Sequence, residues 1–155
     1  RCFPPYPGAV IDNTVQVDQH GIESVVCNRG DGWGLDLLRD AGYLLACIST
    51  ETNDVVKARC EKLRIPYWHG QRDKLTTLRN FAEENKLTAS SMLYIGNDTN
   101  DAPCLAYAGI AVVPADAAPE ATALADWKTD TAGGAGVLRE VARALLIARE
   151  EMDNR

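Results

Sequence analysis

Positive charge and long apolar runs are both scarce in this chain of 155 residues. Its 16 Lys and Arg residues are outnumbered by 22 Asp and Glu residues, which gives a formal net charge of −6. An acidic surface repels phosphate backbones and anionic headgroups. A membrane-spanning helix needs roughly 20 consecutive apolar residues, and the sequence has no such run. We therefore expect no nucleic-acid partner and no membrane partner.

Paired cysteines are also absent. The chain has an odd number of cysteines and no Cys-x-x-Cys pair, and most of the five lie in apolar runs: Cys2, Cys27, Cys47, Cys60 and Cys104. This pattern favours buried thiols in a reducing cytoplasm over disulfides or a zinc site. No signal peptide is visible. Because the sequence begins at Arg1 without Met, it is open whether it is the C-terminal module of a longer protein.

Histidine is rare as well, with only two residues. His20 lies in a predicted hairpin turn, whereas His69 follows Tyr67 and Trp68 at a predicted strand end. His69 is therefore the better candidate for acid–base chemistry, although a histidine in such an aromatic setting more often has a structural role.

Apolar runs and helical patterns alternate along the chain, which is typical of a parallel α/β sheet. The composition, 46% hydrophobic and 25% charged, is that of a globular protein. With no internal repeat and no low-complexity linker, residues 1–155 are predicted to form a single domain. We predict a three-layer Rossmann-like fold, with helices on both faces of a parallel sheet and a β-hairpin at about residues 14–27, after the first strand.

Individual elements follow from the local patterns. The first strand, around Cys2 and Phe3, is broken early by three prolines. Hairpin strands are predicted at 15–17 and 22–26, and further strands at 43–48, 65–68, 92–95 and 110–113, with a last one from Trp127. Helices are predicted at 33–41, 54–63, 74–85, 102–108, 117–124 and from 137 to about 151.

Four loops follow strands of this sheet, where α/β folds place their sites. They cover residues 5–12, 49–51, 71–74 and 96–101. A strand-end hydroxyl from Ser49 or Thr50 can donate to a phosphate, and Lys74 at a helix start can balance its charge. The Gly-Asn-Asp-x-x-Asp turn at 96–101 can hold Mg²⁺ through oxygen ligands. Each element is a weak signal alone, but their order and spacing together are specific.

This combination resembles the haloacid dehalogenase-like phosphatases, and more narrowly their small capless sugar-acid branch. That branch acts on phosphorylated sugar acids of the 3-deoxy-manno-octulosonate and sialate type, and includes the phosphatase-like C-terminal domain of CMP-sialate synthetases. The resemblance covers nearly the whole chain. It includes the hairpin segment at 17–21, the Arg-Gly-Asp-Gly-Trp-Gly run at 29–34, the second motif at 49–53 and the Gly-rich run at 133–136.

The resemblance implies roles for individual residues. Ser49 matches the phosphate-binding hydroxyl and Lys74 the lysine of the third motif, while Asn97, Asp98 and Asp101 match the acidic, metal-binding motif. Further candidates for contact with the sugar-acid end of a substrate are Glu51, Arg59 and Lys62. The structural alternative is an i,i+3 Arg–Lys helix face with one salt-bridging Glu, which would contribute only tenths of a kcal/mol.

The first loop departs from the family pattern, which is Asp-x-Asp-Gly-x-x-x-Asp. Aligned through Gly8 and Asp12, the chain has Pro5 in place of the nucleophile and Pro7 in place of the general acid–base residue. Proline has no carboxylate to attack phosphorus or to bind Mg²⁺, and no backbone N–H. No nearby aspartate replaces them. The first strand is also expected to end early, because each proline removes a hydrogen bond of the sheet.

Three functions compete on this basis. The first is a non-catalytic, phosphatase-like domain that acts in homotetramer assembly or in ligand sensing, beside a fused or partner cytidylyltransferase domain. The second is a repurposed enzyme that keeps a pocket for a phosphorylated or carboxylated sugar and uses other residues, such as His69, Glu51, Asp31 or Asp98. The third, an ordinary Mg²⁺-dependent phosphatase, is the weakest, since it needs an unrecognised nucleophile. We expect Mg²⁺ binding to be weakened or lost.

Overall fold

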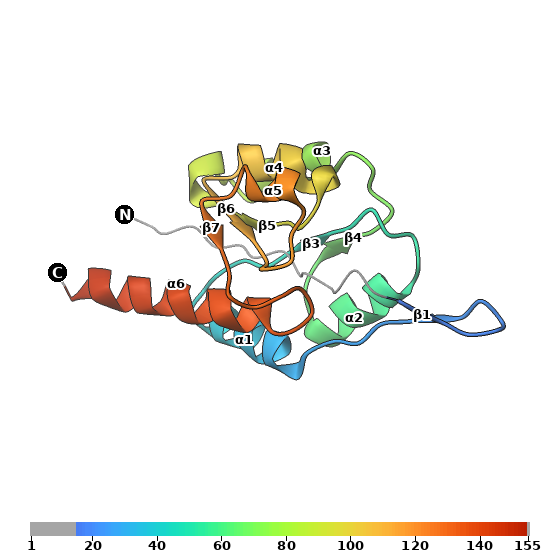
Figure 1. Cartoon of the computed structure of the whole chain (residues 1–155). Helices are drawn as coiled ribbons and strands as arrows, with labels where there is room; N and C mark the ends of the chain where they lie inside the picture. Colours follow the sequence, from blue (N-terminus) through green and yellow to red (C-terminus); the bar gives the residue numbers. More distant parts are fainter. Residues whose placement is uncertain (1–14, 155) are drawn as a thin grey trace.

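The computed structural model describes residues 15–154, so Pro5, Pro7, Asp12 and the predicted first strand lie outside the described residues. Figure 1 shows strands sandwiched between two helical layers. The strands are β1 (Gln16–Val17), β2 (Glu23–Ser24), β3 (Cys47–Ile48), β4 (Tyr67–Trp68), β5 (Leu93–Ile95), β6 (Ile110–Val113) and β7 (Trp127–Lys128). The helices are α1 (Arg29–Asp40), α2 (Val55–Leu63), α3 (Lys74–Glu84), α4 (Ala102–Tyr107), α5 (Pro119–Thr122) and α6 (Val137–Asp153), with short 3-10 turns at Ala89–Ser91 and Thr99–Asp101.

The strands pair in three groups. β3 and β4 run parallel, as do β5, β6 and β7, whereas β1 and β2 form an antiparallel hairpin. Helices α3, α4 and α5 cover one face of the parallel strands, and α1, α2 and α6 cover the other (Figure 1). The predicted three-layer Rossmann-like α/β fold and the hairpin are thus confirmed. No helix within residues 15–154 is long and apolar enough to cross a membrane.

Two apolar clusters hold the layers together, one on each face of the sheet. One joins the inner faces of α1, α2 and α6 to β3, β5 and β6, through buried side chains such as Leu35, Leu138 and Val112. The other packs α3 and α4 against β5 and β6 through Phe81, Cys104 and their neighbours. Each strand of a parallel sheet is buried on both faces, which explains the continuous apolar runs in the sequence. No disulfide joins the cysteines of residues 15–154.

Helix α1 begins four residues earlier than predicted, at Arg29 instead of Trp33. Three glycines in this stretch lower its helix propensity, and for this reason the sequence pattern did not indicate a helix before Trp33. The side chain of Asn28 caps the helix by accepting a hydrogen bond from the N–H of Gly30 at 2.7 Å. A Cβ on Gly34 would lie 2.7 Å from the carbonyl oxygen of Leu138, so glycine is needed for α1 to approach α6. Tertiary packing therefore overrides propensity here.

The hairpin is shorter in its paired region than predicted. Only Gln16–Val17 and Glu23–Ser24 form the ladder. Between them, the Asp18 carboxylate accepts hydrogen bonds from the backbone N–H groups of His20 and Ile22, which fixes a tight turn. Gly21 takes a positive φ of 76° in that turn, a conformation that glycine adopts without strain.

Candidate functional site

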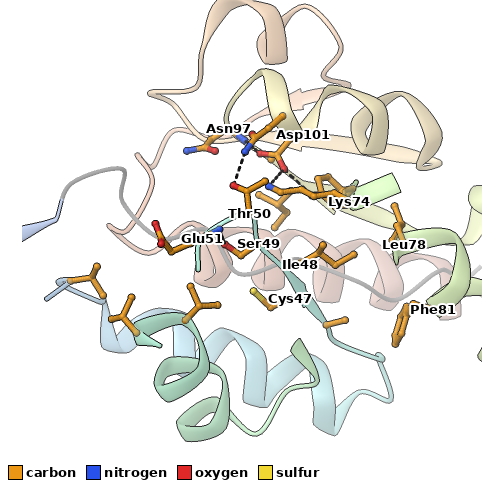
Figure 2. Close-up of a pocket in the computed structure, with 18 of the residues that line it drawn as sticks. Cys47, Ile48, Ser49, Thr50, Glu51, Lys74, Leu78, Phe81, Asn97 and Asp101 are labelled. Atoms are coloured by element: carbon orange, nitrogen blue, oxygen red, sulfur yellow. Dashed lines mark hydrogen bonds and ion pairs between the residues drawn. The ribbon is translucent and has the colours of Figure 1, made fainter. Parts of the chain in front are cut away.

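A cavity of about 260 Å³ opens at the carboxyl ends of β3 and β5. Polar side chains surround its mouth, and Figure 2 shows them projecting from three separate segments. They come from the loop after β3, from the start of α3 and from the turn after β5: Ser49, Thr50, Glu51, Lys74, Asn97, Asn100 and Asp101. The interior is apolar and is walled by side chains of α2, α3 and the two strands. Three of the four strand-end loops identified in the sequence thus contribute residues to one opening, namely 49–51, 71–74 and 96–101.

Lys74 and Asp101 form a buried ion pair at this mouth. The ammonium nitrogen Nζ of Lys74 lies 2.7 Å from Oδ1 of Asp101, and both side chains are less than a tenth exposed. The hydroxyl of Tyr94 donates a second hydrogen bond to the same oxygen at 2.8 Å, and the N–H of Asn97 donates to Oδ2 at 2.9 Å. Asp101 is thus held by three donors, as a buried carboxylate requires.

The turn after β5 is compact because of a glycine. A Cβ on Gly96 would lie 2.5 Å from Cβ of Asp101, so any larger residue would displace the carboxylate from Lys74. Burial, reinforced by the negative charge of Asp101, raises the pKa of Tyr94 well above its ordinary value. Tyr94 therefore stays protonated and remains a donor to Asp101 throughout the physiological pH range.

The start of α3 positions Lys74. The Asp73 carboxylate caps the helix by accepting from the N–H of Thr76 at 3.0 Å, and it also accepts from the Thr76 hydroxyl at 2.7 Å. These hydrogen bonds lower the pKa of Asp73. Because the cap fixes where the helix begins, Lys74 enters the fold as the first residue of α3 and points toward the mouth (Figure 2).

The loop after β3 satisfies much of its own hydrogen bonding. The Ser49 hydroxyl oxygen accepts from the N–H of Glu51 at 3.1 Å, and Oε1 of Glu51 accepts from the N–H groups of Thr52 and Asn53. Glu51 therefore acts locally as a turn cap, with its side chain at the rim (Figure 2). The Thr50 hydroxyl oxygen accepts from Nδ2 of Asn100 at 3.1 Å, which links the two sides of the mouth.

The acidic turn after β5 offers few free oxygens to a metal. Both oxygens of Asp101 already accept hydrogen bonds, and the exposed Asp98 accepts from the N–H of Thr99 at 2.6 Å. Within residues 15–154, no three His, Cys, Asp or Glu side chains gather closely enough to hold a metal ion. Asn97 and Asp98 can each offer one oxygen. The donor set of the described residues therefore does not by itself fit Mg²⁺, which requires six oxygen ligands in total.

Asp98 and four further candidates from the sequence lie away from the cavity wall; the four are Asp31, Arg59, Lys62 and His69. The buried Asp31 carboxylate accepts a hydrogen bond from the N–H of Leu138 at 2.9 Å, at the start of α6. Burial raises the pKa of Asp31, against hydrogen bonds from α6 and the charge of Arg59. Asp31 belongs to the Arg-Gly-Asp-Gly run, and Leu138 belongs to α6, the helix that follows the Gly-rich run at 133–136. This hydrogen bond therefore links the two runs.

The other three of these residues also have structural surroundings. The Arg59 guanidinium donates to the carbonyl oxygen of Asn28 at 3.1 Å, and Lys62 is exposed on α2. The His69 ring packs edge-on against Tyr67, with ring centroids 5.9 Å apart. Its Nδ1 is buried and has no hydrogen bond within the described part of the chain.

Sequence reasoning missed three residues at the site. Tyr94 was assigned to the strand alone, although a tyrosine hydroxyl buried beside a strand end needs a polar partner and could have signalled the network. Asn100 gave no signal, because its contact with Thr50 spans 50 residues. Glu23, on the hairpin, lines the cavity and accepts from Nδ2 of Asn53 at 3.1 Å, so the hairpin is joined to the loop after β3.

The described residues thus form a layered α/β fold with a lysine–aspartate pair and a strand-end serine at one opening. Residues 60–141 match the model of the haloacid dehalogenase-like hydrolase family. The chain is also 31% identical over 147 residues to a curated relative in Salmonella typhi, covering 94% of this chain and 78% of that protein. The chain therefore belongs to the haloacid dehalogenase-like hydrolases.

Within the family, the similarity points to one branch. The Salmonella typhi relative is 3-deoxy-D-manno-octulosonate 8-phosphate phosphatase KdsC. A crystal structure of the Moraxella catarrhalis 3-deoxy-D-manno-octulosonate 8-phosphate phosphatase, in complex with magnesium ion, phosphate ion and KDO, superposes with a TM-score of 0.89 at 28% identity, covering 98% of this chain and 90% of that one. N-acylneuraminate cytidylyltransferase A of Danio rerio is 30% identical over 93% of this chain, which spans 34% of that protein.

Proposed function

We propose that this chain is a phosphatase-like domain of the sugar-acid type that has lost phosphate-ester hydrolysis. One observation carries the proposal: Pro5 and Pro7 occupy the positions that the family pattern gives to the nucleophile and the acid–base residue. A proline ring can neither form an aspartyl-phosphate nor transfer a proton. The loss of these two groups removes several kcal/mol of barrier lowering, at about 1.4 kcal/mol per tenfold of rate.

Ligand binding is the first function that such a domain can retain. The mouth keeps Ser49, Thr50 and Lys74 around one opening, and this supports a phosphorylated or carboxylated sugar, or a sugar nucleotide, as the ligand. The Lys74 charge is shared with Asp101 at 2.7 Å, so less of it is left for an anion. With the donor set described above, Mg²⁺ binding is weakened or lost in this proposal, and we expect the affinity for a phosphate ester to be correspondingly low.

Assembly is the second retained function, supported by the hairpin surface. Apolar side chains on and beside the hairpin are unusually exposed: Val15 49%, Val17 59%, Ile22 65%, Val26 70% and Trp33 57%. Clustered apolar exposure of this kind marks interaction surfaces. We propose a cytoplasmic homotetramer that uses the hairpin, either alone or beside a cytidylyltransferase domain such as the one for which the Danio rerio relative is named.

The loss of hydrolysis is tested by restoring the missing groups. The purified chain should release no phosphate from 3-deoxy-D-manno-octulosonate 8-phosphate or a sialate 9-phosphate with added Mg²⁺, whereas the double variant Pro5→Asp, Pro7→Asp should gain measurable turnover. Adding Ser49→Ala to that double variant should lower the turnover again, which excludes a contaminating hydrolase. Turnover by the unaltered chain at 1 s⁻¹ or more, on the order of working enzymes, would overturn the proposal.

Ligand binding is tested separately by thermal unfolding. A phosphorylated sugar acid that binds the native state at 100 times its Kd raises stability by about 2.7 kcal/mol. Lys74→Gln should abolish the rise in Tm, while Arg59→Gln is the matched control, since Arg59 lies off the cavity wall and contacts Asn28. If Arg59→Gln abolished the rise in Tm and Lys74→Gln did not, the ligand would bind outside the mouth of the cavity.

Assembly is tested by light scattering. Ile22→Asp should dissociate the oligomer, because it places a charge among the exposed apolar side chains of the hairpin, while Gln19→Asp at the polar tip should leave the mass unchanged. A monomeric parent chain at tens of micromolar would reject the assembly function and leave the ligand-binding function standing.

A further inference from the structure

A series of hydrogen bonds connects the hairpin to the loop after β3. Oε2 of Glu23, on β2, accepts from Nδ2 of Asn53 at 3.1 Å. The backbone N–H of Asn53 donates to Oε1 of Glu51 at 2.9 Å, and the N–H of Glu51 donates to the hydroxyl oxygen of Ser49 at 3.1 Å. The series therefore leads from the hairpin to the strand-end hydroxyl at the mouth, where Figure 2 shows Glu51 and Ser49.

Asn53 lies at the centre of this series because its side-chain amide uses both of its ends. Its Nδ2 donates to Glu23, while its Oδ1 accepts from the N–H of Val55 at 2.9 Å, at the start of α2. The amide thus provides a donor for the carboxylate and an acceptor for the N–H. An aspartate at this position would still cap α2 but would have no proton to donate to Glu23. The cap and the link to the hairpin can therefore be separated by substitution.

The hairpin has a short ladder of its own. It contains two residue pairs, Gln16 with Ser24 and Val17 with Glu23. An isolated two-stranded hairpin is marginally stable at best in water, and Figure 1 shows this one extending away from the helical layers. Opposite residues of an antiparallel ladder project to the same face, so Glu23 lies beside the exposed Val17. A partner that packs on Val17 therefore also restrains the residue that holds Asn53.

We propose that Asn53 is a positioning residue that couples the hairpin to the loop after β3, so that a partner on the hairpin and a ligand at the mouth strengthen each other's binding. The inference rests on the proposed function for both binding events. When the hairpin is held, Glu23 orients the Asn53 amide, and the turn that presents Ser49 is held with it. When the hairpin moves away, the part-buried Nδ2 of Asn53 loses its acceptor. Coupling between two binding events is reciprocal and typically changes each affinity by about 5- to 150-fold.

Amide hydrogen exchange tests the coupling on the ligand-free chain. Glu23→Ala removes the acceptor on the hairpin, and the N–H groups of Thr52 and Asn53, which both donate to Glu51, report on the loop. We expect these two amides to exchange at least about fivefold faster in the variant. Ser24→Ala, at the neighbouring position of β2, is the matched control and should leave both rates unchanged. Unchanged rates in Glu23→Ala, or equal increases in the two variants, would overturn the proposal.

A reversal of the hydrogen bond tests the effect on binding. Asn53→Asp keeps an oxygen that accepts from the N–H of Val55, but it places a second carboxylate against that of Glu23. The dissociation constant of the oligomer, measured by light scattering, should rise by at least about fivefold, and inorganic phosphate should raise Tm less than in the parent chain. Adding Glu23→Gln supplies the missing donor and should restore both readouts. A failure of this rescue would overturn the assignment of Asn53 as the coupling residue.

The effect of phosphate on assembly separates this inference from the proposed function. In the parent chain, saturating inorganic phosphate should lower the dissociation constant of the oligomer by at least about fivefold. Phosphate that raises Tm but leaves this constant unchanged would overturn the coupling and leave the proposed ligand binding standing. A parent chain that neither binds phosphate nor assembles would reject the proposed function and with it the effect on binding. The exchange rates of Thr52 and Asn53 would then still show whether the hairpin and the loop are linked.

Discussion

Two buried carboxylates, Asp31 and Asp101, have different partners in the fold. Asp101 lies under the mouth of the cavity and is paired with a buried lysine at 2.7 Å. Asp31 lies where α1 meets α6 and accepts a backbone hydrogen bond from Leu138. Both are about 5% exposed or less, and the sequence suggested a site role for both. One motif residue therefore serves the candidate site, and the other joins two helices.

The difference shows how a motif can persist for structural reasons. In the proposed function the catalytic groups are lost while the mouth keeps a complete ion pair, and removing one member of a buried pair is costly for folding. The loss of either Lys74 or Asp101 alone would therefore destabilise the fold whether or not a phosphate is ever bound. Retention of these residues is compatible with a domain that has lost hydrolysis.

The largest expected effect comes from breaking the buried pair. Lys74→Met should lower the free energy of unfolding by about 3–5 kcal/mol, because Asp101 is left charged and buried without its cation. Urea unfolding at pH 7 measures the loss. Lys62→Met, on the exposed face of α2, is the matched control and should change stability by less than about 0.5 kcal/mol.

The double variant Lys74→Met, Asp101→Asn sharpens this result. The amide oxygen of Asn can still accept from Tyr94 and from the N–H of Asn97, while the unpaired charge is gone. We expect the double variant to be more stable than Lys74→Met alone. A double variant that is less stable would mean that charge burial is not the cause of the loss.

Two glycines of α1 test the other region. Gly34→Ala should cost about 1–3 kcal/mol, because the new Cβ would meet the backbone of α6 at 2.7 Å, and the helices must separate. Gly32→Ala, two residues away, meets only the end of the Leu63 side chain at 3.3 Å. That variant should be neutral or more stable by up to about 1 kcal/mol, from helix propensity. Equal losses in thermal unfolding would contradict the proposed close contact.

Asp31→Asn tests the charge at the same junction. Burial raises the pKa of Asp31 in the folded state above its ordinary value of 3.8. A carboxyl group with a raised pKa favours folding below the unfolded value and loses that contribution as pH rises through the folded pKa. The stability of the variant relative to the parent should therefore increase from about pH 4 upward and then level off. A difference that decreases over this range would show that the ionised carboxylate is favoured at the junction.

The sequence predicted the layers, most strands and three loops of the candidate site, because strand ends of a parallel sheet meet at one edge. Ser49, Lys74 and Asp101 could be placed together for this reason. The role of Asp31 could not be predicted, because its contact with Leu138 spans 107 residues and depends on how α1 packs on α6. The start of α1 was missed since glycine-rich sequence argues against a helix, and only close packing explains it.

The smallest expected effect concerns the hydrogen bond across the mouth, from Asn100 to Thr50 at 3.1 Å. Thr50→Val and Asn100→Ala should each lower stability by about 0.5–1 kcal/mol, the net value of an accessible neutral hydrogen bond. In a double-mutant cycle measured by urea unfolding, the loss of stability in the double variant should be about 0.5 kcal/mol smaller than the sum of the two single losses. Strict additivity would mean that the two loops do not interact in solution. The mouth would then be held by the Lys74–Asp101 pair without help from its rim.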